Sequence, residues 1–246
     1  MQARSSEHTH DGITLVVTRV PESSPGPTFV LVHGIAVSSR YFGPTTTELA
    51  KLGQVYLIDL PGYGAAPKPQ RDVSIADHAA VIASWVAGSG LENPVLVGHS
   101  MGAQVVSQLA VDHPELTDRI VLMCPTMPPN ERSLATGAWL LTLDSVGNPP
   151  KADAIIMADY LFRCGIPYFL KQSKHLFGDR IEDRLGSIAA KTLVIGGDKD
   201  KIVKAPWLKR VTDGIPSARL EIVHGPHVVM WRDPERIAEL IAGHAA

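Results

Sequence analysis

The chain has 246 residues, of which 45% are hydrophobic and 20% charged, and a formal net charge of −2. This length and composition are typical of one large globular domain with a sizeable core. The near-neutral charge gives no reason to expect nucleic acid or an anionic membrane as a partner, and no apolar run approaches the roughly 18 residues that a membrane span needs.

Apolar runs alternate with helical patterns along most of the chain. Residues 11–20 predict an early antiparallel strand at the sheet edge, and a turn cluster rich in Pro, Gly and Ser follows at residues 21–27. Continuous apolar runs are typical of strands that are buried on both faces, and they lie at residues 28–32, 55–58, 95–97, 120–123, 192–195 and 220–223. Helical spacing predicts helices at residues 39–52, 75–87, 101–112, 205–212 and 234–241. This alternation predicts an α/β fold with a mostly parallel sheet flanked by helices.

The segment 125–187 interrupts this alternation, because its pattern is helical without a clear buried strand. Ligands of such sheets bind at the carboxyl ends of the strands, so we interpret this segment as an inserted helical cap over that edge. Residues 1–124 and 188–246 then form the core, and the alternative is a small helical subdomain with its own core. The segment holds six of the 14 aromatic residues, and three of these are candidate substrate-pocket residues, namely Trp139, Tyr160 and Phe162.

A Gly-x-Ser-x-Gly motif stands between a predicted strand and a predicted helix, as Gly98-His99-Ser100-Met101-Gly102. A serine at such a junction occupies a very tight, strained turn, and the small residues on either side let the chain pass close by. Its hydroxyl projects from the carboxyl edge of the sheet, beside a helix N-terminus whose free N–H groups favour negative charge. The motif therefore predicts a nucleophile elbow with Ser100 as the nucleophile.

A serine nucleophile needs a base, and the base is usually a histidine held by a carboxylate. The loop after residues 192–195 offers Asp198 and Asp200, and local chemistry does not decide between them. The loop after residues 220–223 offers His224 and His227. We favour His227, because it lies beyond a Gly-Pro turn and is free to reach across the strand ends.

The developing oxyanion needs hydrogen-bond donors that are fixed in advance. The N–H of Met101, directly after the serine, is one candidate, and the N–H of Ile35, in the loop after residues 28–32, is the second. Spacings typical of a metal site and a glycine-rich phosphate loop are both absent from the sequence. We therefore expect neither a metal nor another cofactor.

Five motifs in register with the predicted strands closely resemble the α/β-hydrolase superfamily, in its capped, esterase-like branch. They are Val30-Leu31-Val32-His33-Gly34, Asp59-Leu60-Pro61-Gly62-Tyr63-Gly64, the motif around Ser100, Gly197-x-x-Asp200-x-x-Val203, and Gly225-Pro226-His227 with Pro234 beyond it. The resemblance implies the α/β-hydrolase fold. It also implies Asp200 rather than Asp198 as the acid, His227 as the base, and the N–H groups of Ile35 and Met101 as the oxyanion hole.

The resemblance implies a cofactor-independent serine hydrolase that cleaves carboxylic esters of small to medium, largely apolar substrates through an acyl-enzyme. The same residues would serve a C–C bond hydrolase or a thioesterase-like enzyme, and a slow-turnover ligand receptor is an alternative of a different class. We expect a small-molecule ester as the substrate, without a nucleic acid or membrane partner.

The two cysteines, Cys124 and Cys164, do not form a disulfide framework. Residues 1–11 are polar and contain no apolar signal core. We therefore expect a reducing, cytoplasmic location. The sequence leaves the oligomeric state open.

Overall fold

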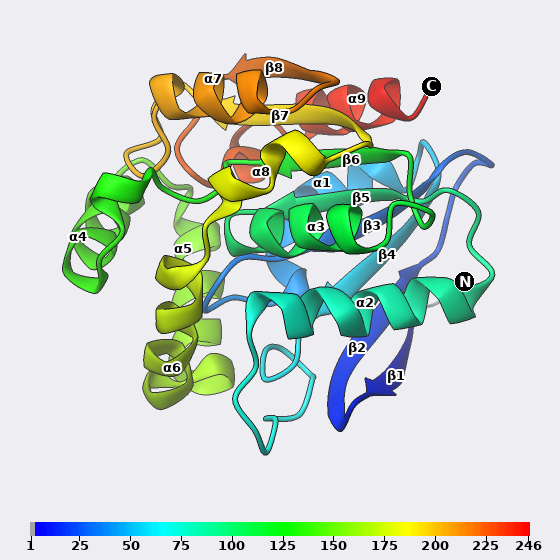
Figure 1. Cartoon of the computed structure of the whole chain (residues 1–246), viewed down its shortest axis with the longest axis horizontal. Helices are drawn as coiled ribbons and strands as arrows, with labels where there is room; N and C mark the ends of the chain where they lie inside the picture. The colour runs from blue at the N-terminus through cyan, green and yellow to red at the C-terminus, as the bar shows by residue number, and fades with distance from the viewer. Residues whose placement is uncertain (1–2) are drawn as a thin grey trace.

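One mixed sheet organises the chain in the computed structural model, which describes residues 3–246 (Figure 1). Its strands are β1 (Arg4–His10), β2 (Ile13–Val20), β3 (Thr28–Val32), β4 (Gln54–Asp59), β5 (Val95–His99), β6 (Arg119–Met123), β7 (Lys191–Gly197) and β8 (Ala218–Val223). Their order in space is β1-β2-β4-β3-β5-β6-β7-β8. The pairs β1–β2 and β2–β4 are antiparallel, and the five described pairs from β4 to β8 are parallel, which confirms the predicted fold class.

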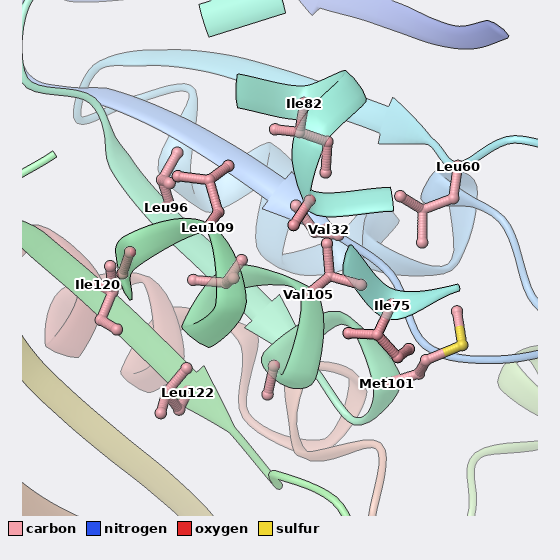
Figure 2. Close-up of a cluster of buried hydrophobic side chains, with 14 of the residues drawn as sticks. Val32, Leu60, Ile75, Ile82, Leu96, Met101, Val105, Leu109, Ile120 and Leu122 are labelled. Atoms are coloured by element: carbon pink, nitrogen blue, oxygen red, sulfur yellow. The ribbon is translucent and has the colours of Figure 1, made fainter. Parts of the chain in front are cut away.

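Helices cover both faces of the sheet. Helices α2 (Ile75–Ser89) and α3 (Met101–Asp112) pack together on one face, and α1 (Gly43–Leu49) and α9 (Pro234–Ala245) pack together on the other. Figure 2 shows Leu109 of α3 packed beside Leu96 of β5 and Ile120 of β6. Because neighbouring residues of a strand point to opposite faces, Val95 and Val97 instead belong to the cluster beneath α1 and α9. The central strands therefore bury apolar side chains on both faces of the sheet.

The sheet edge differs from the sequence prediction. Residues 11–20 were expected to form the edge, but β2 lies one strand inward and β1 occupies the edge. Most side chains of β1 are exposed, so its sequence lacks the apolar alternation that would reveal a strand. The helix expected at residues 39–52 is also divided, into a 3-10 helix at Ser39–Phe42 and α1, which has a proline in its first turn.

The segment between β6 and β7 is helical and contains no strand. Its main helices are α4 (Leu134–Ser145), α5 (Pro150–Ala158) and α6 (Ile166–Gly178), and a π-helical turn at Asp159–Cys164 joins α5 to α6. Figure 1 shows the three helices grouped beyond one end of the sheet. Helix α7 (Ala205–Gly214) and the short α8 (Val229–Arg232) complete the core. Within residues 3–246, no helix combines the length and apolar character needed to cross a membrane.

Candidate active site

Ser100 sits in a strained turn between β5 and α3. Its φ of 55° lies in the left-handed region, which non-glycine residues rarely adopt. The flanking glycines are required by packing, because a Cβ on Gly98 would overlap the carbonyl of Gly102, and a Cβ on Gly102 would overlap the carbonyl of Val32. The structure therefore shows the tight strand-to-helix turn that the Gly-x-Ser-x-Gly motif predicts.

Backbone strain of this kind gathers at the carboxyl edge of three neighbouring strands. Ala36 follows β3 with a φ of 68°, Ser100 follows β5, and Cys124 follows β6 with a φ of 45°. Such residues cost about 1–3 kcal/mol each and persist where the surrounding structure fixes them. The register of the sheet, which pairs Val32 with Gly98, brings the loops after β3 and β5 together.

Asp200 and His227 form a buried hydrogen-bonded pair. Oδ2 of Asp200 lies 2.8 Å from Nδ1 of His227, while Oδ1 accepts the N–H groups of Ile202 at 2.7 Å and Val203 at 2.9 Å. Burial acts to raise the pKa of Asp200, but His227 and the two N–H groups outweigh it and hold that pKa below its usual value. Burial acts to lower the pKa of His227, but the Asp200 carboxylate outweighs it and raises that pKa.

The other candidates from the same two loops form a separate pair at the surface. Oδ2 of Asp198 lies 3.1 Å from Nδ1 of His224, and Oδ1 of Asp198 accepts the N–H of Gly225 at 3.0 Å. Both side chains are exposed. The four candidates thus separate into a buried pair beside Ser100 and a solvated pair that holds the two loops together.

Ser100 and His227 line one small cavity of about 40 Å³. Ile35 lines it too, and the loop after β3 approaches closely, since a Cβ on Gly34 would lie 3.1 Å from Cβ of Ser100. Met101 is the first residue of α3, so its N–H has no partner within the helix. The rest of the lining comes from the loop after β6, from α4 and α6, and from Ile202, through Thr126, Met127, Leu134, Gly137, Phe169, Ser173, Leu176 and Phe177.

The three aromatic residues expected in the substrate pocket do not line this cavity. Trp139 is 62% exposed and Phe162 is 84% exposed, while Tyr160 packs against Phe169. Helix geometry explains the difference for α4, because Gly137 faces the cavity and a residue two positions further on points to the opposite side. Other aromatic residues of the same segment, Phe169 and Phe177, take that place.

A buried hydrogen-bond chain connects the loops of the site, and no pattern in the sequence predicts it. The N–H of Gly34 donates to the Tyr41 hydroxyl at 3.3 Å, Tyr41 donates to Nδ1 of His99, and Nε2 of His99 donates to the carbonyl of His227 at 2.9 Å. The carbonyl only accepts, so Nε2 carries the hydrogen and Nδ1 must be an acceptor. Burial, together with nearby His227, lowers the pKa of His99 to about 3, so this ring is neutral.

One cluster of residues in the described chain has the composition of a metal site. Ligand atoms of His99, Cys124 and His227 lie within 4.8 Å of one another. Both ring nitrogens of His99 are engaged in the hydrogen-bond chain, and Nδ1 of His227 is engaged by Asp200. Burial raises the pKa of the Cys124 thiol well above its usual value. A metal would have to break these contacts, so the arrangement suits an acid–base pair better than a metal centre.

The chain belongs to the alpha/beta hydrolase family, whose model matches residues 29–240. It is 25% identical to the uncharacterized hydrolase YugF of Bacillus subtilis, with 95% of each chain covered. An uncharacterized protein of Mycobacterium tuberculosis is 35% identical over 98 residues, which are 40% of this chain but only 29% of that protein. The structure of an esterase from Exiguobacterium antarcticum shares the fold with a TM-score of 0.83 at 17% identity, covering 97% of this chain and 98% of the esterase. The family match shows the family, whereas the similarity to the esterase shows the shared fold alone.

Proposed function

We propose that this protein is a serine hydrolase that cleaves carboxylic esters of small to medium, largely apolar substrates. The observation that carries the proposal is the buried 2.8 Å contact between Asp200 and His227, next to a cavity that His227 shares with Ser100. Family membership supports the broader class of hydrolase. The triad and the ester substrate are our inference from the geometry.

In the proposed reaction, Oγ of Ser100 attacks the ester carbonyl carbon while Nε2 of His227 takes its proton. Asp200 holds the Nδ1–H tautomer of His227 and stabilises the imidazolium that forms. The carbonyl oxygen becomes an oxyanion and accepts hydrogen bonds from the N–H groups of Ile35 and Met101. We infer that the strained turn at Ser100 holds its hydroxyl near these donors, so that the reaction needs little reorganisation.

The tetrahedral intermediate then collapses and the bond to the alkoxy group breaks. His227 gives its proton to the departing alcohol, and the acyl group stays on Ser100 as an ester. Water enters, His227 takes a proton from it, and the resulting hydroxide adds to the acyl carbon. The second collapse releases the carboxylic acid and returns the proton to Ser100, so the cycle consumes one water and needs no cofactor.

The cavity lining supports a short, uncharged acyl group. Apart from His227, none of the described side chains that line the cavity is ionisable, and most of the lining is apolar. We infer that this narrow, largely apolar cavity takes a short acyl chain rather than a long fatty acyl chain. Residues 125–187 supply much of this lining through α4 and α6, so in this function they serve as a cap that selects the substrate.

A fluorophosphonate probe tests the proposed nucleophile. We expect mass spectrometry to find the label on Ser100 in the wild-type protein and to find none in Ser100→Ala. His227→Gln should abolish labelling, whereas His224→Gln should label like wild type, because His224 belongs to the exposed pair. A folded wild-type protein that resists the probe, or a Ser100→Ala variant that hydrolyses esters at the wild-type rate, contradicts the proposal.

A panel of p-nitrophenyl esters tests the substrate size. We expect kcat/KM to be highest for the shortest acyl chains and to decrease as the chain outgrows the cavity. Rates that increase steadily toward long fatty acyl chains contradict the assignment of this cavity as the acyl site.

A further inference from the structure

Asp144 is a buried carboxylate in a position that local structure disfavours. It lies in the last turn of α4 and is 4% exposed. A negative charge in the last turn of a helix opposes the helix dipole, and burying a carboxylate costs free energy unless strong partners compensate. Among the ion pairs of residues 3–246, none links Asp144 to a lysine or arginine. Its partners must therefore explain its placement.

The partners of Asp144 are the backbones of the two loops that carry Asp200 and His227. The N–H of His227 donates to both carboxylate oxygens, at 3.0 Å to Oδ2 and 3.2 Å to Oδ1. The N–H of Lys201, the residue after Asp200, donates to Oδ1 at 3.1 Å. One side chain from the helical segment thus joins the loop after β7 to the loop after β8, directly behind the acid–base pair.

Asp144 is also one of two carboxylates that act on the imidazole of His227. Asp200 touches the ring, and Asp144 adds a second negative charge nearby. The other titratable groups around the ring are His99 and Cys124. Burial lowers the pKa of His99 to about 3 and raises the pKa of Cys124 well above its usual value, so both are uncharged at neutral pH.

On the function proposed above, we propose that Asp144 is a positioning residue for the hydrolytic reaction. Its hydrogen bonds fix the loops of Asp200 and His227 relative to each other, and its charge favours the imidazolium form of His227 that arises when Ser100 attacks. Because Asp144 belongs to α4, the position of this helix against the core affects how well His227 acts as the base. Displacement of α4 removes one of the two carboxylates from the environment of His227.

Histidine NMR titration tests the charge without requiring turnover. Asparagine at position 144 keeps the size and an acceptor oxygen but loses the charge, so we expect Asp144→Asn to lower the pKa of His227 by about half a unit to one unit. The signal of His227 is identified by its loss in His227→Gln. Asp153→Asn, which removes a carboxylate from neighbouring α5, should leave the pKa of His227 unchanged. An unchanged pKa in Asp144→Asn, or an equal shift in Asp153→Asn, overturns the proposal.

The rate of fluorophosphonate labelling against pH tests the consequence for Ser100. We expect the acid limb of the labelling profile to move to lower pH in Asp144→Asn by the same amount as the NMR titration. Asp144→Glu keeps the charge but displaces the oxygens, so it should retain the acid limb and label about tenfold more slowly. Circular dichroism checks that each variant is folded. If Asp144→Asn does not fold, Asp144→Glu provides the test.

The controls separate this role from the proposed function itself. A wild-type protein that does not label at all shows that the serine is not an activated nucleophile, and the role of Asp144 in that reaction falls with it. A wild-type protein that labels, with Asp144→Asn giving the same acid limb and rate, leaves the proposed function standing and overturns the role of Asp144.

Discussion

The contact between His227 and Asp200 fixes the direction of the pH dependence. Burial favours the neutral imidazole, but the carboxylates of Asp200 and Asp144 together outweigh it and raise the pKa of His227 above its ordinary value. In the proposed reaction His227 must be unprotonated to accept the proton of Ser100, so we predict that activity is lost as the pH falls through this raised pKa. We predict an acid limb of kcat/KM for a neutral ester above the usual histidine value of about 6.5. A midpoint well below that value contradicts the assignment of the base.

The two aspartates of one loop provide a matched pair of variants. Asp200→Asn removes the charge that supports the imidazolium and allows the wrong tautomer, so we predict a decrease in kcat of about 10³–10⁴-fold. Asp198→Asn changes the exposed pair with His224 and keeps an acceptor oxygen for the N–H of Gly225, so it should keep kcat within about twofold of wild type. Steady-state kinetics on both variants checks this, and a similar loss in the two variants would contradict the distinction between the buried and exposed pairs.

The Tyr41 hydroxyl joins the loop after β3 to His99 through buried hydrogen bonds. Tyr41→Phe leaves the N–H of Gly34 and Nδ1 of His99 without their buried partner. Each unsatisfied buried group costs about 1–3 kcal/mol, so we predict a decrease of about 2–4 kcal/mol in the free energy of unfolding, measured by urea denaturation. Tyr56→Phe is the control, because Tyr56 packs against Trp85 and its hydroxyl has no hydrogen-bond partner in residues 3–246. Equal losses in both variants would assign the effect to packing.

At the scale of elements, the sequence predicts best where one strong local pattern decides the structure. The bounds of β3 and α3 match the predictions, because a continuous apolar run and a strand-to-helix turn define them. The exposed β1 carries no such pattern. The lining of the cavity could not be predicted, because it depends on which face of α4 packs inward, and the sequence alone does not distinguish Gly137 from Trp139. The contacts of Asp144 with two distant loops are likewise purely tertiary.

Helix α3, which follows Ser100, passes very close to the end of β3 at Gly102. A Cβ on Gly102 would overlap the carbonyl of Val32, and both backbones belong to buried elements that cannot move apart cheaply. We predict that Gly102→Ala lowers the free energy of unfolding by about 3 kcal/mol or abolishes folding. Gly88→Ala, on α2, has open space around the new methyl group and should be neutral or stabilise by up to about 1 kcal/mol. Urea denaturation measures the stability of both variants. Similar unfolding midpoints for Gly102→Ala and Gly88→Ala would contradict this explanation.

At the scale of the whole molecule, buried polar contacts join the helical segment to the core. Asp159, at the start of the π-helical turn, accepts the N–H of Ser38 at 2.9 Å as well as its hydroxyl, and it lies 2.7 Å from the guanidinium of Arg40. Gln172 of α6 pairs with His78 of α2 at 3.0 Å. Such contacts stabilise only one arrangement, because an unpaired buried polar group is costly. These specific contacts therefore fix the helical segment in one position on the core.

Removal of the contact between Asp159 and Ser38 should destabilise both the helical segment and the loop after β3. Asp159→Ala leaves the N–H of Ser38 without its acceptor, so we predict a loss of about 2–3 kcal/mol in the free energy of unfolding and faster hydrogen exchange in residues 34–40 and 159–178 but not in β6 or β7. Asp72→Asn is the matched control, since Asp72 is exposed and meets the partly exposed His175 of the same segment in a pair worth less than about 1 kcal/mol.

The loop that Asp159 holds is also the loop of Ile35, the proposed oxyanion donor. A loosened loop weakens a contact that forms only in the transition state, so kcat should decrease more than KM increases. An Asp159→Ala variant that loses stability but keeps kcat would show that the contact seats the helical segment without supporting the oxyanion hole.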